Sequence, residues 1–181
     1  MSQNDARTVT ATASSAGILD IKSLVLLAIL LAAGFILNMT LGNALAIVGI
    51  KPQFIIAAYA LAILLTDASY LQAIIFAVIS ACVIQLTTSI PGLNFVTETI
   101  AALAMVVLIK SGIGGENVNP LVATFVTTLI SGALFALLGT VIMGGAIASA
   151  AVKLPLVLGT AFFNAIMVQA LSIPLKEVFA K

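Results

Sequence analysis

Residues 22–40 read KSLVLLAILLAAGFILNMT and decide the fold class of this chain. After Lys22 the stretch contains no charged residue, and its length is close to the roughly 20 residues with which a helix crosses a bilayer. The preceding segment, 1–20, is rich in Ser, Thr and Ala and has no apolar run. We therefore expect a flexible cytoplasmic tail over 1–20 and a first transmembrane helix that is retained in the protein.

The same apolar character extends over the rest of the chain. Of the 181 residues, 62% are hydrophobic and 7% are charged, and the mean hydropathy is +1.31. Soluble domains carry about a quarter charged residues. Apolar runs predict six spans, at 22–40, 53–65, 71–89, 97–109, 121–143 and 154–178. We expect an all-α membrane protein in which residues 21–181 form one domain, a bundle of six transmembrane helices.

The distribution of Lys and Arg predicts the orientation, because cytoplasmic loops carry an excess of these residues. Six spans place both termini on one side of the membrane. With a cytoplasmic N-terminus, five of the seven basic residues lie inside, and Lys51 and Lys153 lie outside. We expect both termini to be cytoplasmic and three loops, 41–52, 90–96 and 144–153, to face outward.

Several function classes are excluded by composition. The net charge is +1 and the basic residues are scattered, so the chain offers no patch for nucleic acid. The chain has no histidine and one cysteine, Cys82, and we expect no metal or other cofactor. The phosphate-binding pattern GxxxxGK[ST] is absent, and no nucleophile with a neighbouring base is visible. We therefore expect no enzyme, and no ATP hydrolysis by the chain itself.

Charged and polar residues gather at the predicted outward loops. Glu98 is the one acid with apolar neighbours in a span, where an ionisable group costs about 2 to 3 kcal/mol at full depth and is usually paired or functional. Lys51, Lys153 and Asn94 belong to the same side and would converge with it at an outer mouth. The alternatives are a solvated interfacial Glu98 and lysines that extend outward into water.

Small and polar residues also recur at helical spacing. Ala28 and Ala32 lie one turn apart in the first span, a pattern that lets another helix approach closely. The alternative is that these alanines pack inside the bundle. Polar residues form three stripes that would either line a solute cavity or bond to backbone: Cys82, Gln85 and Ser89; Thr124, Thr127, Thr128 and Ser131, continuing to Phe135; and Thr160, Asn164 and Met167.

A set of short motifs in order carries a family resemblance. They are GIKPQF (49–54), AILL (62–65), LTT (86–88), PG (91–92), NFV (94–96), LP (154–155) and Asn164, together with the Ala28/Ala32 pair. Over 22–178 the chain resembles the substrate-binding S components of energy-coupling factor (ECF) transporters, most closely the tryptophan-uptake members. It departs at Gln53, where members often carry an acid, and at Thr97–Glu98, in place of an acid–lysine pair.

The resemblance implies a subunit of the prokaryotic cell membrane that captures a scarce nutrient from outside. A separate transmembrane coupling protein and two ATPase subunits would drive transport, and the Ala28/Ala32 face would dock on the coupling protein. The implied substrate is tryptophan. No cofactor is implied.

The chemistry of a zwitterionic amino acid suggests how the site would be built. Glu98 would pair with the ammonium group, and Lys51 or Lys153 would bind the carboxylate. Asn94 and Asn164 are the expected polar contacts. The flat indole ring would need apolar and aromatic walls, for which the candidates are Tyr59, Phe95, Phe162 and Phe163.

Three other functions stay open at this point. A self-sufficient secondary transporter or channel would require deeply placed acids or broken helices at mid-membrane. An S component for another amino acid or a vitamin would keep the fold and change the ligand. A structural membrane subunit without a ligand would leave the loop charges and Asn164 without a role.

Overall fold

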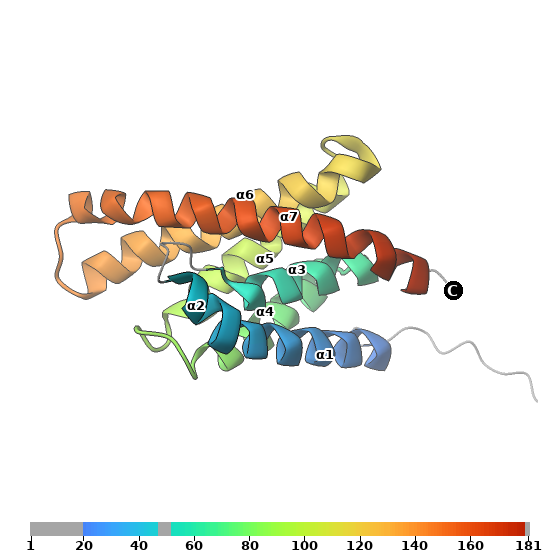
Figure 1. Ribbon diagram of the computed structural model, residues 1–181, viewed down its shortest axis with the longest axis horizontal. Coiled ribbons are helices and arrows are strands. Elements are labelled where there is room, and N and C mark those ends of the chain that lie inside the picture. Colours follow the sequence, from blue (N-terminus) through green and yellow to red (C-terminus); the bar gives the residue numbers. More distant parts are fainter. Residues whose placement is uncertain (1–19, 47–51, 180–181) are drawn as a thin grey trace, which may run out of the picture.

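The computed structural model describes residues 20–46 and 52–179, and within these ranges every element is helical (Figure 1). Helix α1 runs continuously into a π-helical turn, η1, and a short helix, α2; a 3-10 segment, η2, precedes the last helix. The elements are α1 (Ile21–Leu37), η1 (Asn38–Gly42), α2 (Asn43–Ala46), α3 (Phe54–Thr66), α4 (Tyr70–Ile84), α5 (Leu93–Ser111), α6 (Gly115–Ile142), η2 (Ile147–Lys153) and α7 (Leu154–Phe179). The all-α prediction is confirmed for the described residues.

Four of these helical stretches are long and apolar enough to cross a membrane. They are Ile21–Leu45, Leu93–Ser111, Val118–Ile142 and Ile147–Glu177. Helices α3 and α4 have 13 and 15 residues, so at 1.5 Å per residue each measures about 20 Å, against about 30 Å for the hydrocarbon core. The chain is therefore a membrane protein by length and composition of its helices. Apart from the short α2 and the two η segments, the described residues form six helices, which correspond in order to the six predicted segments.

Two helix boundaries near the α4–α5 connection differ from the predicted ones, because polar residues and a glycine there end one helix and start the next. Helix α4 ends at Ile84, because the chain turns at Gln85–Thr87 where the prediction continued to residue 89. Helix α5 begins at Leu93, four residues before the predicted start. Gly92 precedes it with φ 85°, a left-handed conformation that glycine adopts without strain, and its N–H donates to Gln85 Oε1 at 2.9 Å. The early start places Glu98 in the second turn of α5.

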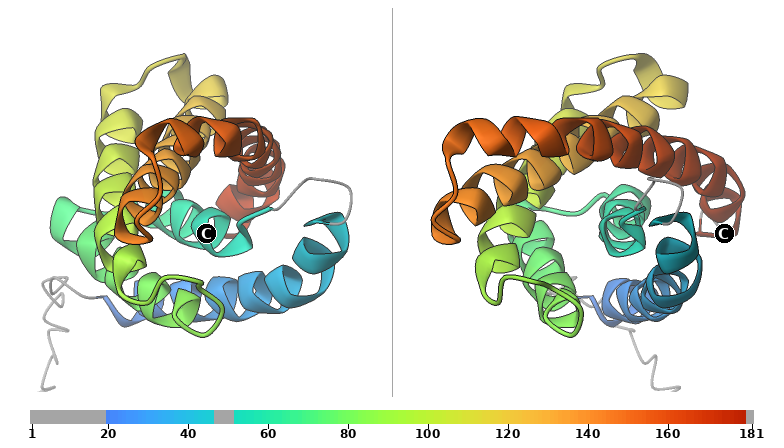
Figure 2. Two further views of the ribbon diagram at one scale, coloured as in Figure 1. Left: turned by 90° about the vertical axis from the view of Figure 1, so that its left-hand side faces the viewer. Right: turned by 60° about the vertical axis from the view of Figure 1, so that its left-hand side comes forward.

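Helix α3 lies at the centre of the bundle (Figure 2). Every residue from Phe54 to Ile63 is buried, and the helix contacts α1, α4, α5, α6 and α7. Such a helix is apolar on all sides, as expected for one that is surrounded by other helices. Around it, α4 packs on α5, α5 on α6 and α6 on α7, whereas α1 packs mainly on α3.

Close approach between α1 and α3 occurs at Gly34. A β-carbon at Gly34 would lie 2.9 Å from the backbone oxygen of Phe54, so only glycine fits there. Ala28 and Ala32, in contrast, are exposed on the outside of the bundle. The alternative that these two alanines pack inside the bundle is therefore wrong.

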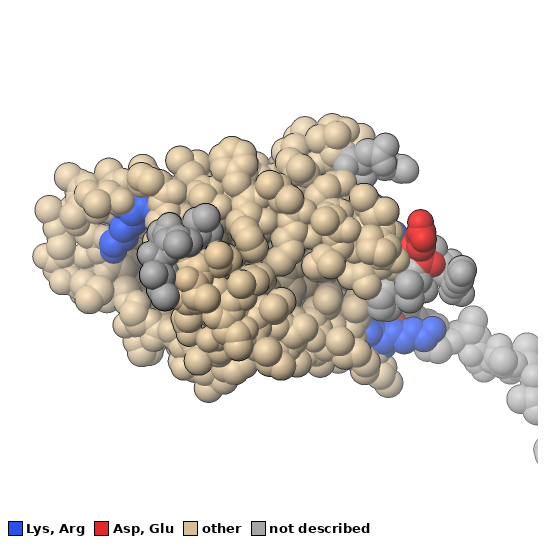
Figure 3. All heavy atoms as spheres, viewed as in Figure 1, with Lys and Arg blue, Asp and Glu red and all other residues tan. Residues whose placement is uncertain are grey.

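The described parts of the connections α1–α3, α4–α5 and α6–α7 lie toward one end of the bundle, and the C-terminal helix ends at the other (Figure 1). The few charged side chains on the visible face lie toward its two ends, and the surface between them carries none (Figure 3). Such an uncharged surface is the one that lipid tails favour. The end that carries the three connections is the one predicted to face outward.

Candidate functional site

A cavity of about 500 Å³ lies at the end that carries the three connections. Its floor is the start of the short central helix, with Pro52, Gln53 and Ile56, and its walls come from η1, α5, α6, η2, α7 and the α4–α5 connection. The cavity lies at the start of the short α3, between the longer helices α5, α6 and α7. Its volume is within the range of about 300 to 1,000 Å³ that is usual for small-molecule sites.

Glu98 lines this cavity and is 2% exposed. Tyr59 Oη donates to Glu98 Oε2 at 2.9 Å, and Ser131 Oγ donates to Oε1 at 2.7 Å. Thr97 Oγ1 is a longer donor to Oε1, at 3.3 Å. All three donors are uncharged hydroxyls, and no described cation forms a salt bridge with the carboxylate. The alternative that Glu98 is a solvated residue at the membrane interface is wrong, because the side chain is buried in the bundle. The early start of α5 places it there.

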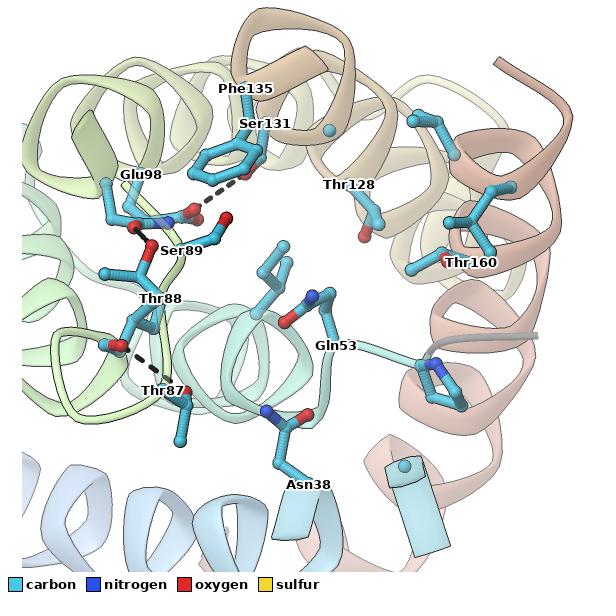
Figure 4. A pocket seen from close by; sticks show the side chains of 18 of the residues that line it. Asn38, Gln53, Thr87, Thr88, Ser89, Glu98, Thr128, Ser131, Phe135 and Thr160 are labelled. Atoms are coloured by element: carbon cyan, nitrogen blue, oxygen red, sulfur yellow. Dashed lines mark hydrogen bonds between the residues drawn. The ribbon is translucent and has the colours of Figure 1, made fainter. Parts of the chain in front are cut away.

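Asn94, one turn before Glu98 on α5, also lines the cavity and has a hydrogen bond of its own. Thr88 Oγ1 donates to Asn94 Oδ1 at 2.7 Å. This bond leaves the amide nitrogen of Asn94 as a donor at the cavity. The hydrogen bonds from Tyr59, Ser131 and Thr97 hold the Glu98 carboxylate in one orientation, and Figure 4 shows the bond from Ser131.

Lys153 lines the same cavity but does not pair with Glu98. Its Nζ donates to Thr140 Oγ1 at 3.0 Å, across the junction of η2 and α6. Lys51, the other predicted cation, lies outside the described residues. Glu98, Asn94 and Lys153 are thus the predicted site residues that the fold brings to one cavity.

Tyr59 and Asn164 do not line the cavity; they are buried and form hydrogen bonds to residues that do. Tyr59 is fully buried, and its role is that of a hydroxyl donor to Glu98, not of an aromatic wall. Asn164 is also fully buried. Its Nδ2 donates to the backbone oxygen of Gln53 at 3.1 Å and to Thr128 Oγ1 at 3.4 Å, so it joins α7 to two residues that line the cavity.

The phenylalanine candidates for the apolar wall do not line this cavity. Phe162 is 59% exposed on the outside of α7 and packs against Phe125, with ring centroids 4.8 Å apart. Phe163 packs edge-to-face on Phe54 at 5.7 Å, and Phe95 does not line the cavity. The aromatic residue that lines it is Phe135. Adjacent positions on a helix point about 100° apart, and composition alone did not tell which side of α7 is internal.

Phe135 could have been identified from the stripe that it ends on α6. Thr128 and Ser131 of that stripe line the cavity, whereas Thr124 and Thr127 are buried below it. The stripe on α4 behaves differently: Cys82 is exposed on the outer side of α4, and only Ser89 reaches the cavity. Gln53 and Asn38 also line it, and no periodic pattern marked either of them.

No group of three or more His, Cys, Asp or Glu side chains in the described part of the chain could hold a metal ion. The polar groups of the cavity are hydroxyls, amides, one carboxylate and one ammonium group, a set suited to a small polar solute. No family model, curated protein or solved structure matches the chain.

Proposed function

We propose that this chain is the substrate-capture subunit of an ECF-type importer, with an amino acid, most specifically tryptophan, as its ligand. One observation carries the proposal. Glu98 is a buried carboxylate at a cavity of about 500 Å³, and its described partners are all neutral. A buried charge is costly unless it is paired, so a ligand with an ammonium group would supply the missing partner.

The rest of the cavity is compatible with an amino acid. Phe135, Leu156 and Val157 give an apolar side for a large side chain, and the amides and hydroxyls give donors for a carboxylate. Such a mixture, largely apolar with a few polar groups, is typical of small-molecule sites. A vitamin or another amino acid with a cationic group would satisfy Glu98 in the same way.

The proposed topology has six crossings and both termini in the cytoplasm of a prokaryotic cell. It is supported by the six helices, by the excess of Lys and Arg at the ends of the chain and by the position of the cavity at the opposite end. Helices α3 and α4 would complete their crossings within a bundle of longer helices. A cavity on the outer side is where a capture subunit would bind its ligand.

The proposed partners are a transmembrane coupling protein and two ATPase subunits. The exposed Ala28 and Ala32 on α1 offer a smooth face to a helix of the coupling protein. The chain lacks a phosphate-binding loop, so the ATPases would supply the energy. In lipid, such small residues allow backbones to come close, which is the main source of helix association there.

A secondary transporter is the second candidate, favoured by two observations. Glu98 is an acid buried within the bundle, and the π-helical turn η1 (Asn38–Gly42), which follows α1, lines the cavity. Both features occur in carriers that couple transport to an ion gradient. The requirement for an ATPase separates this candidate from the first.

The direct test of the proposed ligand is a thermal-shift screen of the purified protein in detergent against amino acids and vitamins. A ligand at 100 times its dissociation constant should add about 2.7 kcal/mol to the free energy of unfolding. We expect L-tryptophan to raise the melting temperature more than indole-3-propionate, which lacks the ammonium group. Stabilisation by a vitamin instead would reassign the ligand, and equal stabilisation by indole-3-propionate would remove Glu98 from the binding argument.

A further inference from the structure

Two side-chain amides that line the cavity, Asn38 and Gln53, have donors without a partner among the described residues. Asn38 lies in η1, and its Oδ1 accepts from the backbone N–H of Phe54 at 3.4 Å, so its nitrogen points elsewhere. Gln53 directly precedes α3, and its side chain does not cap the helix. Both residues line the cavity, and among the described residues neither Asn38 Nδ2 nor Gln53 Nε2 has a hydrogen-bond partner.

The backbone around these amides favours negative charge. The Phe54 N–H at the start of α3 is bound by Asn38 Oδ1, and the Ile56 and Ala57 N–H groups are bound by the Gln53 backbone oxygen. The aligned peptide dipoles still give the N-terminus of α3 a positive partial charge. Gln53 is held in place by Asn164, which is fully buried and donates to the Gln53 backbone oxygen at 3.1 Å. The two amides therefore lie on a fixed part of the bundle, beside a helix start that attracts anions.

The amides and Glu98 form two different poles of one cavity. Figure 4 shows Glu98 and Asn38 on different sides of it, with Gln53 pointing into the space between them. The Glu98 carboxylate can pair with a cationic group of a ligand, and the Gln53 side chain can donate hydrogen bonds without carrying a charge. Lys153, the described cation at the cavity, is held by Thr140.

We propose that Gln53, with Asn38 as a second donor, binds the carboxylate of a zwitterionic ligand whose ammonium group pairs with Glu98. This inference rests on the proposed function and deepens it, because it assigns the carboxylate to neutral amides at the start of α3 and not to a lysine. Neutral amides bind a carboxylate without the cost of removing a second charge from water. Selectivity would follow: a ligand that lacks the carboxylate leaves these donors unsatisfied.

The test compares L-tryptophan with tryptamine, which lacks the carboxylate, by isothermal titration on the full chain in detergent. Gln53→Glu replaces the donor by a negative charge of the same size. We expect it to weaken L-tryptophan binding tenfold or more and to leave tryptamine binding unchanged or stronger. Gln85→Glu is the matched control, because Gln85 lies at the same end outside the cavity and its Oε1 acceptor for Gly92 is kept. Glu98→Gln should weaken both ligands.

Each outcome decides a specific question. If the ratio of tryptophan to tryptamine affinity is the same in Gln53→Glu and in the native protein, the inference is overturned and the proposed function is untouched. If the native protein binds neither compound, the proposed ligand fails and the inference with it. If Gln53→Glu does not fold, Asn38→Asp takes its place, because Asp can still accept from the Phe54 N–H, and the same change in ratio is required.

Discussion

Glu98 and the hydroxyls around it bring together residues from three helices, α3, α5 and α6. Hydroxyl and amide donors keep a carboxylate oriented without neutralising it. A ligand cation that enters the cavity would therefore meet a charge already aimed at it.

The first prediction concerns this charge. Glu98→Gln keeps the size of the side chain and removes the anion, so the ammonium group of L-tryptophan loses its partner. Loss of one partner from a desolvated charge pair costs about 2 to 5 kcal/mol, and each 1.4 kcal/mol is a factor of ten in affinity. We expect the dissociation constant to rise tenfold or much more, as measured by isothermal titration.

Two comparisons make that result specific. Glu177→Gln removes an exposed carboxylate at the far end of α7 and should leave the affinity unchanged. Indole lacks both charged groups and should bind weakly to the native protein and to Glu98→Gln alike. Equal losses for tryptophan and indole would indicate a damaged fold, and an unchanged affinity for tryptophan would show that Glu98 is not part of the site.

The second prediction concerns Tyr59, the buried donor to Glu98 Oε2. Tyr59→Phe removes one hydrogen bond to a charged group, which contributes about 1.5 to 3 kcal/mol. We expect the free energy of unfolding in detergent to fall by about that amount. The control is Tyr70→Phe, because the Tyr70 hydroxyl is on an exposed residue. Equal effects of the two substitutions would contradict a special role for the Tyr59 hydroxyl.

At the residue scale, the sequence pointed to Glu98 and Asn94 because polar residues near the end of an apolar span are unusual. It could not assign Tyr59 as a donor. Helix α3 is apolar on every side, so its periodicity contains no information on which residue faces α5. Gln53 and Asn38 were missed as ligand contacts because a single amide next to a helix end has no distinctive pattern.

At the scale of elements, the packing of α1 on α3 depends on Gly34. Our third prediction is that Gly34→Ala destabilises the protein by about 1 to 3 kcal/mol, the usual cost of overpacking, because its β-carbon would meet the Phe54 backbone at 2.9 Å. Gly159→Ala is the control within α7, where a β-carbon meets nothing within 4 Å and should be neutral or stabilising. Thermal unfolding of both variants measures the difference, and equal melting temperatures would refute the close contact.

The fourth prediction concerns the outer face of α1. Ala28→Trp adds bulk where the coupling protein would dock, and should lower ATP-driven uptake while ligand affinity stays unchanged. Val78→Trp is the control, because Val78 is an exposed apolar residue on another helix, α4. Uptake is measured in cells that contain the whole transporter. If Ala28→Trp lowers affinity and uptake together, or if Val78→Trp has the same effect, the docking proposal fails.

The existence and order of the six helices were predictable, because long apolar runs are the strongest signal in a sequence. Their ends were less so. The start of α5 at Leu93 depends on the left-handed conformation of Gly92 and on the hydrogen bond from the Gly92 N–H to Gln85 Oε1. Gly92 lies between the predicted apolar runs and Gln85 near the end of one, so a prediction based on those runs does not detect this contact. The earlier start places Glu98 in the second turn of α5, where it is buried, and so decides between the two alternatives that the sequence left open.

For the whole molecule, energy coupling gives the fifth prediction. If the chain is a capture subunit, it should bind L-tryptophan but not accumulate it when it is expressed in a host that lacks any ECF module. Adding the coupling protein and ATPases should restore uptake, measured with radiolabelled tryptophan. Accumulation by the chain alone that collapses with an uncoupler would favour the secondary transporter instead.

The arrangement of helices around α3 was beyond the reach of sequence patterns. Each helix has apolar residues on most of its surface, since lipid and protein neighbours are both apolar. Phe162 and Phe163 are adjacent and of the same type, so the sequence does not distinguish them. In the fold, Phe162 is exposed and Phe163 packs against Phe54. The cavity itself lies at the start of α3, between longer helices, so it is a property of the assembled bundle.

The shortness of the central helix also bears on how the protein is made. Helix α3 is too short to cross the bilayer alone, and the helices α5, α6 and α7 that surround it are synthesised later. The turn at Asp67–Ser69 joins it directly to α4, which is also short. We therefore expect the two to leave the translocon as a helical hairpin, held close to α1 through Gly34, and to reach full depth in the bilayer once the later helices have closed around them.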